Sequence, residues 1–328
     1  MNARILTATA LAAVLGAVLP ARAADPQLLN LVMPDVKVIA GVNVDQAKTT
    51  PFGQYVLSQI TGQRQQNLQN LINVTGFDPT KDVSELLLAT DTVGASATPG
   101  TNQGLVLARG TFDPAKIAAA ATAGGALTES YGGVTIIEGA KQLAGFAFLS
   151  VTSPADATYV VAGDIANVKA AIDRQTSPSS LPAALVTKIN TWSATEDAWV
   201  ISTVPPSTLK PPSAAPNVPG LGANGGTAFQ NIVDGAAGVK FGANVVVTIQ
   251  AEADNAQDAT TMSGVLQLLV SVAKMQAAQN AQLAALANGL NVTNENTLVN
   301  VTITMPEDQL QQLLSHPRPA ARRRVRQM

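Results

Sequence analysis

The chain has 328 residues, no cysteine and a single histidine, His316. These counts exclude disulfide bonds, thiolate metal sites and, within one chain, histidine-based triads and multi-histidine metal sites. The formal net charge of −2 combines an acidic body with a basic end. An acidic body with only 4% aromatic residues argues against a nucleic-acid groove on the folded part.

Residues 1–23 have the pattern of a signal peptide. Arg4 precedes an apolar run from Ile5 to Leu19, and Ala21-Arg22-Ala23 matches the small-x-small pattern that a signal peptidase cleaves after. The apolar run is shorter than the roughly 20 residues that a membrane-spanning helix needs. We therefore expect a protein exported to the periplasm or outside the cell, soluble and without a transmembrane segment once mature. A retained, uncleaved anchor is the alternative.

Residues 24–175 are predicted to form a first α+β lobe. Its elements are a strand at 36–44, one or two helices from Thr50-Pro51 to about Val74, strands at 85–90 and 104–110, a helix from 113 to about 121, and a hairpin that turns at Tyr131-Gly132-Gly133. This β-α-β-β-α-β order is the ferredoxin-like arrangement. Strands at 145–150 and 158–162 and a helix capped by Asp164 follow.

Residues 176–196 are interpreted as a connection with a short helix at 185–191, and residues 197–316 as a second α+β lobe. The expected elements are a strand at 197–204, a brief helix at 229–233, strands near Val239 and at 244–251, a long helix, strands at 290–293 and 298–304, and a helix at 306–314. The order of the first lobe recurs. We therefore predict an internal duplication of two ferredoxin-like lobes, each an antiparallel sheet with helices on one face.

The long helix, at about 255–288, is the longest amphipathic stretch. Asp254 and Gln257 resemble a capping box, and Asn288-Gly289 is a C-terminal stop signal. Its apolar residues fall close to one stripe at helical spacing, which predicts that the helix lies on a sheet. They are Met262, Val265, Leu266, Leu269, Val272, Met275, Leu283 and Leu286.

Three acidic residues, Glu252, Asp254 and Asp258, lie close to the predicted start of this helix. Three carboxylates near a helix start could hold a hard cation such as calcium. The favoured interpretation is a helix cap and a complement to the helix dipole, which is also how we interpret the acidic residues at other strand-to-helix junctions.

Two short motifs, one typical of dinucleotide binding and one of acyl transfer, occur without the neighbouring sequence that normally accompanies them. Residues 220–225, Gly-Leu-Gly-Ala-Asn-Gly, match the dinucleotide-binding pattern, but a proline-rich segment precedes them instead of a strand. Ser271 and Lys274 match Ser-x-x-Lys, but the chain contains neither Ser-Asp-Asn nor Lys-Thr-Gly. The first motif is interpreted as part of a disordered Pro/Gly loop at 205–226, the second as the polar side of the long helix. Trp192 and Trp199 are interpreted as packing residues rather than a sugar-stacking pair.

Residues 317–328 form an arginine-rich tail that we expect to be disordered. Its basic residues suit a polyanion such as a phospholipid headgroup, lipopolysaccharide or nucleic acid, and a solvated tail without a function is an equal alternative. The residues are Arg318, Arg322, Arg323, Arg324 and Arg326.

Three runs resemble exported bacterial proteins of unknown function in which similar phrases recur in α+β repeats. They are GLVLARGTFDPAKIAAA (104–120), YGGVTIIEG (131–139) and YVVAGDIANVKAAID (159–173). The resemblance covers about residues 36–174. It implies repeated α+β architecture and export, and it brings no active-site motif.

These observations predict a non-enzymatic protein that binds or scaffolds in the cell envelope, with the arginine tail as an attachment to an anionic surface. No catalytic residue and no cofactor is assigned. The alternative is a carboxylate-dependent hydrolase of an envelope polymer, because such carboxylate pairs have no recognisable spacing in a sequence. Two carboxylates facing each other in a concave pocket would favour that alternative.

Overall fold

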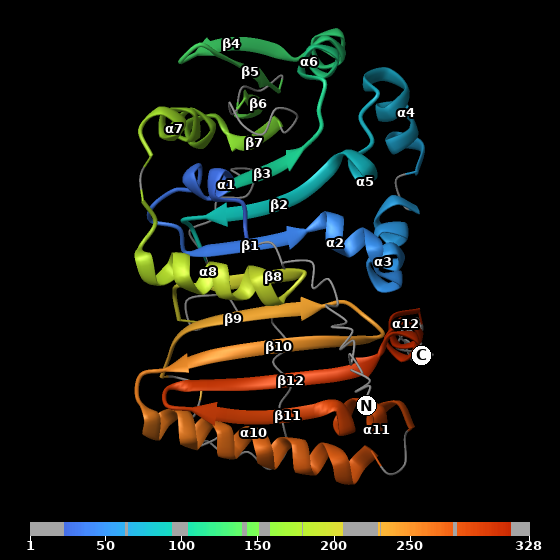
Figure 1. The fold of residues 1–328 in the computed structure, drawn as a ribbon, viewed down its shortest axis with the longest axis vertical. Coiled ribbons are helices and arrows are strands. Elements are labelled where there is room, and N and C mark those ends of the chain that lie inside the picture. Colours follow the sequence, from blue (N-terminus) through green and yellow to red (C-terminus); the bar gives the residue numbers. More distant parts are fainter. Residues whose placement is uncertain are drawn as a thin grey trace, which may run out of the picture.

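The structure is a computed structural model that describes residues 23–62, 65–93, 104–139, 143–150, 158–178, 180–205, 229, 231–277 and 281–315. Its centre is one 12-stranded sheet with the order β11-β12-β10-β9-β8-β1-β2-β3-β7-β6-β5-β4 (Figure 1). All neighbouring strands are antiparallel. The fold class is therefore mixed α+β, as predicted.

The strands are β1 (Val38–Asn43), β2 (Val83–Thr90), β3 (Gly104–Gly110), β4 (Leu127–Tyr131), β5 (Val134–Glu138), β6 (Ala144–Ser150), β7 (Thr158–Asp164), β8 (Ala198–Ser202), β9 (Ile232–Lys240), β10 (Asn244–Ala253), β11 (Leu290–Glu295) and β12 (Leu298–Pro306). The helices are α1 (Pro26–Asn30), α2 (Val44–Thr49), α3 (Pro51–Gly62), α4 (Gln65–Thr75), α5 (Pro79–Asp82), α6 (Pro114–Ala123), α7 (Ile165–Thr176), α8 (Ala183–Thr195), α10 (Ala256–Ala277), α11 (Ala281–Gly289) and α12 (Glu307–Ser315).

The two halves of the chain share this sheet instead of forming two separate ones. β1 pairs with β8, so that Ile39 lies opposite Ile201. A strand with an unpaired edge exposes a row of amide and carbonyl groups, and this pairing satisfies them for both halves. The predicted connection at 176–196 is part of the fold as well, because α8 places Ile189 and Trp192 in the main core.

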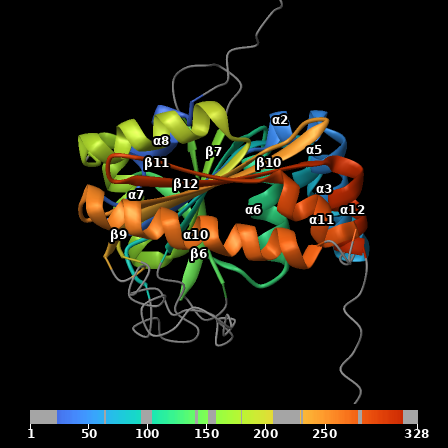
Figure 2. The ribbon, with the colours of Figure 1, turned by 90° about the horizontal axis from the view of Figure 1, so that it is seen from below.

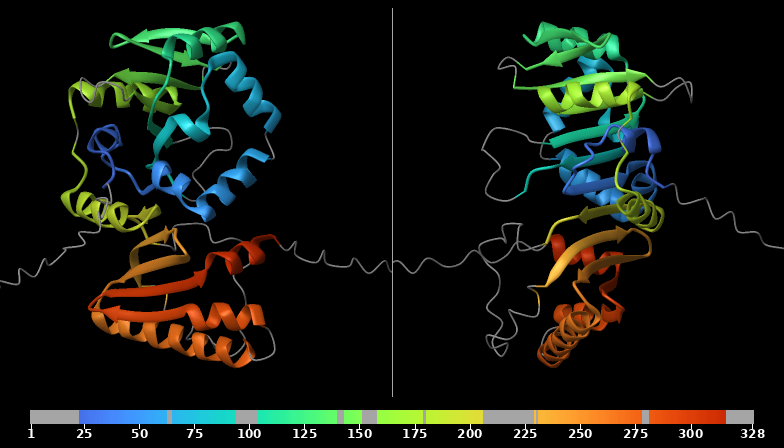
Figure 3. Two further views of the ribbon diagram at one scale, coloured as in Figure 1. Left: turned by 45° about the vertical axis from the view of Figure 1, so that its right-hand side comes forward. Right: turned by 90° about the vertical axis from the view of Figure 1, so that its left-hand side faces the viewer.

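One face of the sheet, here called the covered face, lies under α1, α7 and α8 (Figure 3). Ile39, Leu87, Leu107, Val161 and Ile201 point into this layer and are fully buried. Trp199 packs against Gly41, where a side chain would collide with the indole, and Trp192 packs against Gly238. Both tryptophans are therefore packing residues, as predicted.

The opposite face, here called the open face, carries α6 near one end of the sheet and α10 at the other. Figure 2 shows α8 and α10 on opposite sides of the strands. Met262 of α10 is buried with Ala253 and Val299 of the sheet. Helices thus lie on both faces, which corrects the prediction of one helical face. The physical reason is visible in β3, where Leu105, Val106, Leu107 and Ala108 give apolar side chains to both sides.

The predicted long helix is divided into α10 and α11, which pack against each other, while residues 278–280 lie outside the description. α10 lies on β10, β11 and β12, which confirms the expectation that it needs a sheet. Its N-cap is Asn255 instead of Asp254, because Asn255 Oδ1 accepts a hydrogen bond from the Asp258 amide at 3.0 Å.

Of the other local predictions, two helix starts are confirmed and one helix is wrong. Asp113 and Asp164 cap α6 and α7, each accepting a backbone hydrogen bond at 3.0 Å. The helix expected at 229–233 is wrong, since Ile232 opens β9 and pairs with Ala253. The short α1 was not predicted, although its buried Leu28 and Leu29 belong to the main core.

Candidate functional site

A single row of apolar residues crosses the open face from β11 to β5. Each member is the cross-strand partner of the next, so the row runs perpendicular to the strands. Its members, here called the apolar row, are Val292, Val301, Ile249, Ala237, Val200, Ala40, Leu88, Val106, Ala162, Phe146 and Ile137. Side chains in such register lie about 5 Å apart and form a continuous surface.

The middle of the apolar row is not covered by described residues. Four of its large side chains remain exposed: Leu88 by 51%, Val106 by 41%, Val200 by 37% and Ile249 by 45%. By contrast, Met262 of α10 covers Val299 of β12 near one end of the sheet. Contiguous apolar surface of this kind on a folded protein marks an interaction site.

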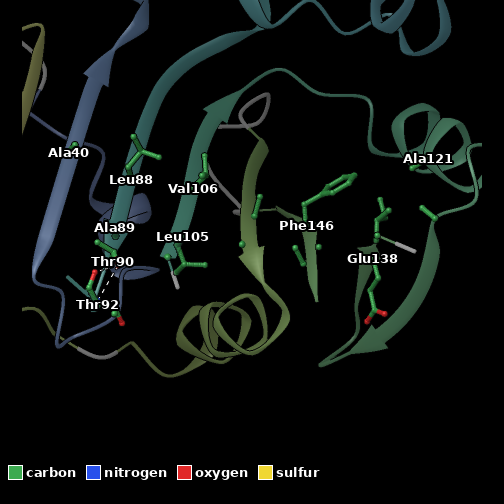
Figure 4. Close-up of a pocket in the computed structure, with 18 of the residues that line it drawn as sticks. Ala40, Leu88, Ala89, Thr90, Thr92, Leu105, Val106, Ala121, Glu138 and Phe146 are labelled. Atoms are coloured by element: carbon green, nitrogen blue, oxygen red, sulfur yellow. Dashed lines mark hydrogen bonds between the residues drawn. The ribbon is translucent and has the colours of Figure 1, made fainter. Parts of the chain in front are cut away.

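A hollow of about 940 Å³ lies along the row between β1 and α6. Its floor includes Ala40, Leu88, Val106, Ala162 and Phe146, and Ala121 and Ala126 close it from the side of α6. Figure 4 shows Leu88, Val106 and Phe146 on the same side of the strands. The volume falls in the range of pockets that bind small molecules.

Glu138 is the one ionisable residue among the described residues that line this hollow. It follows Ile137 in β5, so its side chain points to the covered face, and Figure 4 shows its carboxylate directed away from Phe146. There it lies near Glu129, whose Oε1 is 2.8 Å from Lys169 Nζ of α7. Burial, and then the neighbouring Glu129 carboxyl, raise the pKa of Glu138. The carboxyl group of Glu138 thus lies on the covered face, although the residue itself lines the hollow.

A second hollow of about 600 Å³ continues along the row toward α10. Val200, Ala237 and Ile249 form its floor, Met262 and Leu266 its helical wall, and Val38 lines both hollows. Of the described residues lining it, only Asp234 is ionisable, and Lys188 Nζ lies 2.6 Å from its Oδ1. The two hollows therefore form one apolar trough.

A cluster of partly buried polar side chains, here called the polar cluster, lies on the covered face near the centre of the sheet. Arg109 Nε is 3.2 Å from Asp25 Oδ2 and 3.7 Å from Glu85 Oε2, and the Tyr159 hydroxyl donates to Asp25 Oδ2 at 3.1 Å. Burial raises the pKa of Glu85, and burial followed by the Asp25 charge raises the pKa of Tyr159 to about 12. These contacts fasten the N-terminal segment to β2, β3 and β7, which is a structural role.

The three acidic residues considered for calcium bind groups of the protein itself. Glu252 Oε2 lies 3.8 Å from Lys188 Nζ, while Asp258 Oδ2 accepts hydrogen bonds from Asn231 at 2.9 Å and Asn255 at 2.8 Å. The Asp254 amide donates to the Asn231 carbonyl at 2.9 Å. Across the described ranges, no group of three His, Cys, Asp or Glu side chains is placed to hold a metal ion.

The Ser-x-x-Lys pair lies on the exposed side of α10, and the Ser271 hydroxyl donates to the Gln267 carbonyl at 2.8 Å. This hydrogen bond is the ordinary one of a helical serine. Three predicted features lie outside the described residues: the Gly-rich motif at 220–225, residues 1–22 of the expected signal peptide, and the tail with Arg318, Arg322, Arg323, Arg324 and Arg326.

Two further carboxyl groups, those of Glu196 and Asp197, are adjacent in the chain and partly buried. Glu196 and Asp197, at the junction of α8 and β8, both have pKa values raised by burial. Asp197 Oδ2 accepts a hydrogen bond from the Phe241 amide at 2.6 Å, which ties it to the β9–β10 turn. Neither residue lines the apolar trough.

The trough was missed by sequence reasoning, although a signal was present. GLVLARG, YVVAG and GFAFLS place apolar residues at successive positions, which gives a strand two apolar faces. No family model, no curated protein and no solved structure matches the chain. Within the ranges that the structure describes, none of the helices is both long and apolar enough to cross a membrane.

Proposed function

We propose that this chain is a non-enzymatic binding protein of the cell envelope and that it holds its partner on the open face. The observation that carries the proposal is the apolar trough, in which Leu88, Val106, Val200 and Ile249 stay exposed on one continuous row. Leaving such side chains in water forfeits roughly 25 cal/mol per Å² of apolar surface, so a partner that covers them gains that free energy.

The composition of the trough favours binding over catalysis. Among the described residues that line it, two are ionisable. The side chain of Glu138 points to the covered face, and Asp234 forms an ion pair with Lys188. A glycosidase-like mechanism needs two carboxyl groups on either side of a substrate bond. The exposed apolar trough therefore supports a binding function, and no described carboxyl pair in the trough supports the hydrolase alternative.

Export and attachment complete the proposal. The signal peptide at 1–23 delivers the chain to the periplasm or the exterior, as in the exported repeat proteins that it resembles, and the five arginines of the tail hold it at an anionic surface. We also propose an internal duplication of the ferredoxin-like kind. It is supported by the similar paths β3-α6 and β10-α10, in which a central strand leads to a helix on the open face.

The test is photo-cross-linking in cells that export the full chain. A photoreactive amino acid replaces Leu88, and in a matched control it replaces Val74 on α4, which is 66% exposed and lies away from the trough. We expect an ultraviolet-dependent adduct from position 88 and none from position 74. Equal labelling at both positions, or none at either, would contradict the proposal.

A further inference from the structure

We propose that the trough binds the hydrocarbon chains of an amphiphile, a lipid-like molecule, laid across the strands along the apolar row. This inference rests on the binding function above and names the chemical class of its ligand. It follows from three properties of the described residues: the chemistry of the lining, the shape of the floor and the length of the row.

The few uncharged polar side chains of the lining already have hydrogen-bond partners within the protein. The hydroxyl groups of Thr90, Thr92 and Ser202 donate to nearby residues of their own chain segments, and the Gln250 amide donates to Asn300 Oδ1 at 2.9 Å. Along the larger hollow the row presents Ala40, Leu88, Val106, Ala162 and Phe146, and the backbone groups beneath them are paired in the strand ladders. A polar ligand would lose its water there without gaining replacement hydrogen bonds, which disfavours its binding. A hydrocarbon chain loses nothing of this kind.

The floor of the larger hollow is uneven, because small residues lie on both sides of a larger pair. Ala40 and Ala162 flank Leu88 and Val106, and Gly104 leaves no side chain at the start of β3. With Phe146 as the one aromatic residue of the described lining of this hollow, stacking on a sugar or a base has little support. A flexible chain follows such an uneven floor more closely than a rigid ring.

The length of the open part of the row also fits. From Ile249 to Phe146 the row makes seven strand-to-strand steps. At roughly 4.8 Å per step this gives roughly 34 Å, about twice the roughly 15 Å that the chains of one bilayer leaflet span. The trough can therefore hold two chains end to end, or one long chain.

The experiment measures how affinity depends on chain length and on headgroup. Purified full-length protein is loaded with an apolar fluorescent probe, which is displaced by saturated fatty acids of increasing length below their critical micelle concentrations. Burying one methylene contributes about 0.8 kcal/mol, so we expect the apparent Kd to fall about twofold to fourfold per added methylene. At one fixed chain length, the apparent Kd values of alkyl maltosides and alkyl phosphocholines should lie within about threefold of that of the fatty acid, since the lining contacts the hydrocarbon chain and not the headgroup.

Three variants connect this binding to the trough. Leu88→Asp should weaken the longest chain at least about tenfold, because it places a charge in the floor. Leu127→Asp is the matched control, since Leu127 is also exposed but lies on β4 away from both hollows. Ala162→Leu fills the groove without adding polarity and should weaken long chains more than short ones. It keeps the test valid if Leu88→Asp fails to fold.

The inference is overturned if affinity does not change with chain length, or if it follows the headgroup. It is also overturned if Leu88→Asp abolishes a concentration-dependent dimer in light scattering while no amphiphile binds, because the occupant would then be a second copy of the chain. An adduct at position 88 in cells without any chain-length dependence would leave the binding function standing and remove only the hydrocarbon ligand. Failure of both experiments would remove both.

Discussion

The hydroxyl of Tyr159 donates a hydrogen bond to Asp25 Oδ2 at 3.1 Å, although 134 residues separate the two along the chain. Asp25 is also the N-cap of α1, and its amide donates to Glu85 Oε1 at 3.0 Å. The first described residues are thereby fixed to the middle of the sheet. Ala24, directly after the expected cleavage site, is buried and donates to Ser193 Oγ at 2.9 Å.

The titration of Tyr159 should differ from that of the other tyrosines. Its pKa is raised to about 12, first by burial and then by the Asp25 charge. Because the folded-state pKa lies above the unfolded value near 10, this group contributes stability below pH 10 that is lost as pH rises toward 12. Ultraviolet titration should show a step near pH 12 that disappears in Tyr159→Phe. A single common step for all three tyrosines would contradict this.

Removing the cation of the polar cluster should destabilise the fold. Arg109→Met leaves the carboxylates of Asp25 and Glu85 partly buried without their positive partner. We expect a loss of about 3 kcal/mol of unfolding free energy at pH 7 in urea titration. The loss should shrink at acidic pH, because a protonated Glu85, whose pKa burial already raises, no longer needs the cation.

The matched control for Arg109 is Lys116→Met, which removes a solvent-exposed ion pair. Lys116 Nζ lies 3.1 Å from Asp113 Oδ2 on the surface of α6. Exposed pairs of this kind contribute little to stability, because solvent and salt screen them. An equal effect of the two substitutions would show that the polar cluster has no special structural role.

The N-terminal segment should contribute to stability as a core element. Leu28 is completely buried, and its truncation in Leu28→Ala should lower the unfolding free energy by about 2–5 kcal/mol. Leu127→Ala, at an exposed position of β4, should change it by less than about 0.5 kcal/mol. Similar melting temperatures for both variants would mean that residues 24–36 are not required for the fold.

Two glycine substitutions should have opposite signs. A methyl group at Gly41 would meet the indole of Trp199, so Gly41→Ala should destabilise by about 1–3 kcal/mol. Gly264 lies within α10 with open space around it, and Gly264→Ala should stabilise by about 0.5–1 kcal/mol through helix propensity. Thermal unfolding of both variants checks the pair. Destabilisation by Gly264→Ala would show that α10 is packed more closely than described.

Local order could be read from the sequence wherever a neighbouring residue enforces it. Asp113 and Asp164 accept amides three residues ahead, so the starts of α6 and α7 were found. Tyr131-Gly132-Gly133 gave the β4–β5 turn, because both glycines adopt positive φ values of 57° and 80°. The helix expected at 229–233 was wrong because the partner of Ile232 is Ala253, which lies far along the chain.

The sequence by itself determined the class of elements, the positions of most strands and several helix caps, since these depend on residues only a few positions apart. Only the tertiary structure decided that β1 pairs with β8 to make one sheet, and that Val200, Ala40 and Leu88 form part of one exposed row. Backbone pairing between distant strands has no local signature. A strand with two apolar faces does not reveal which face a helix will cover and which it will leave for a ligand.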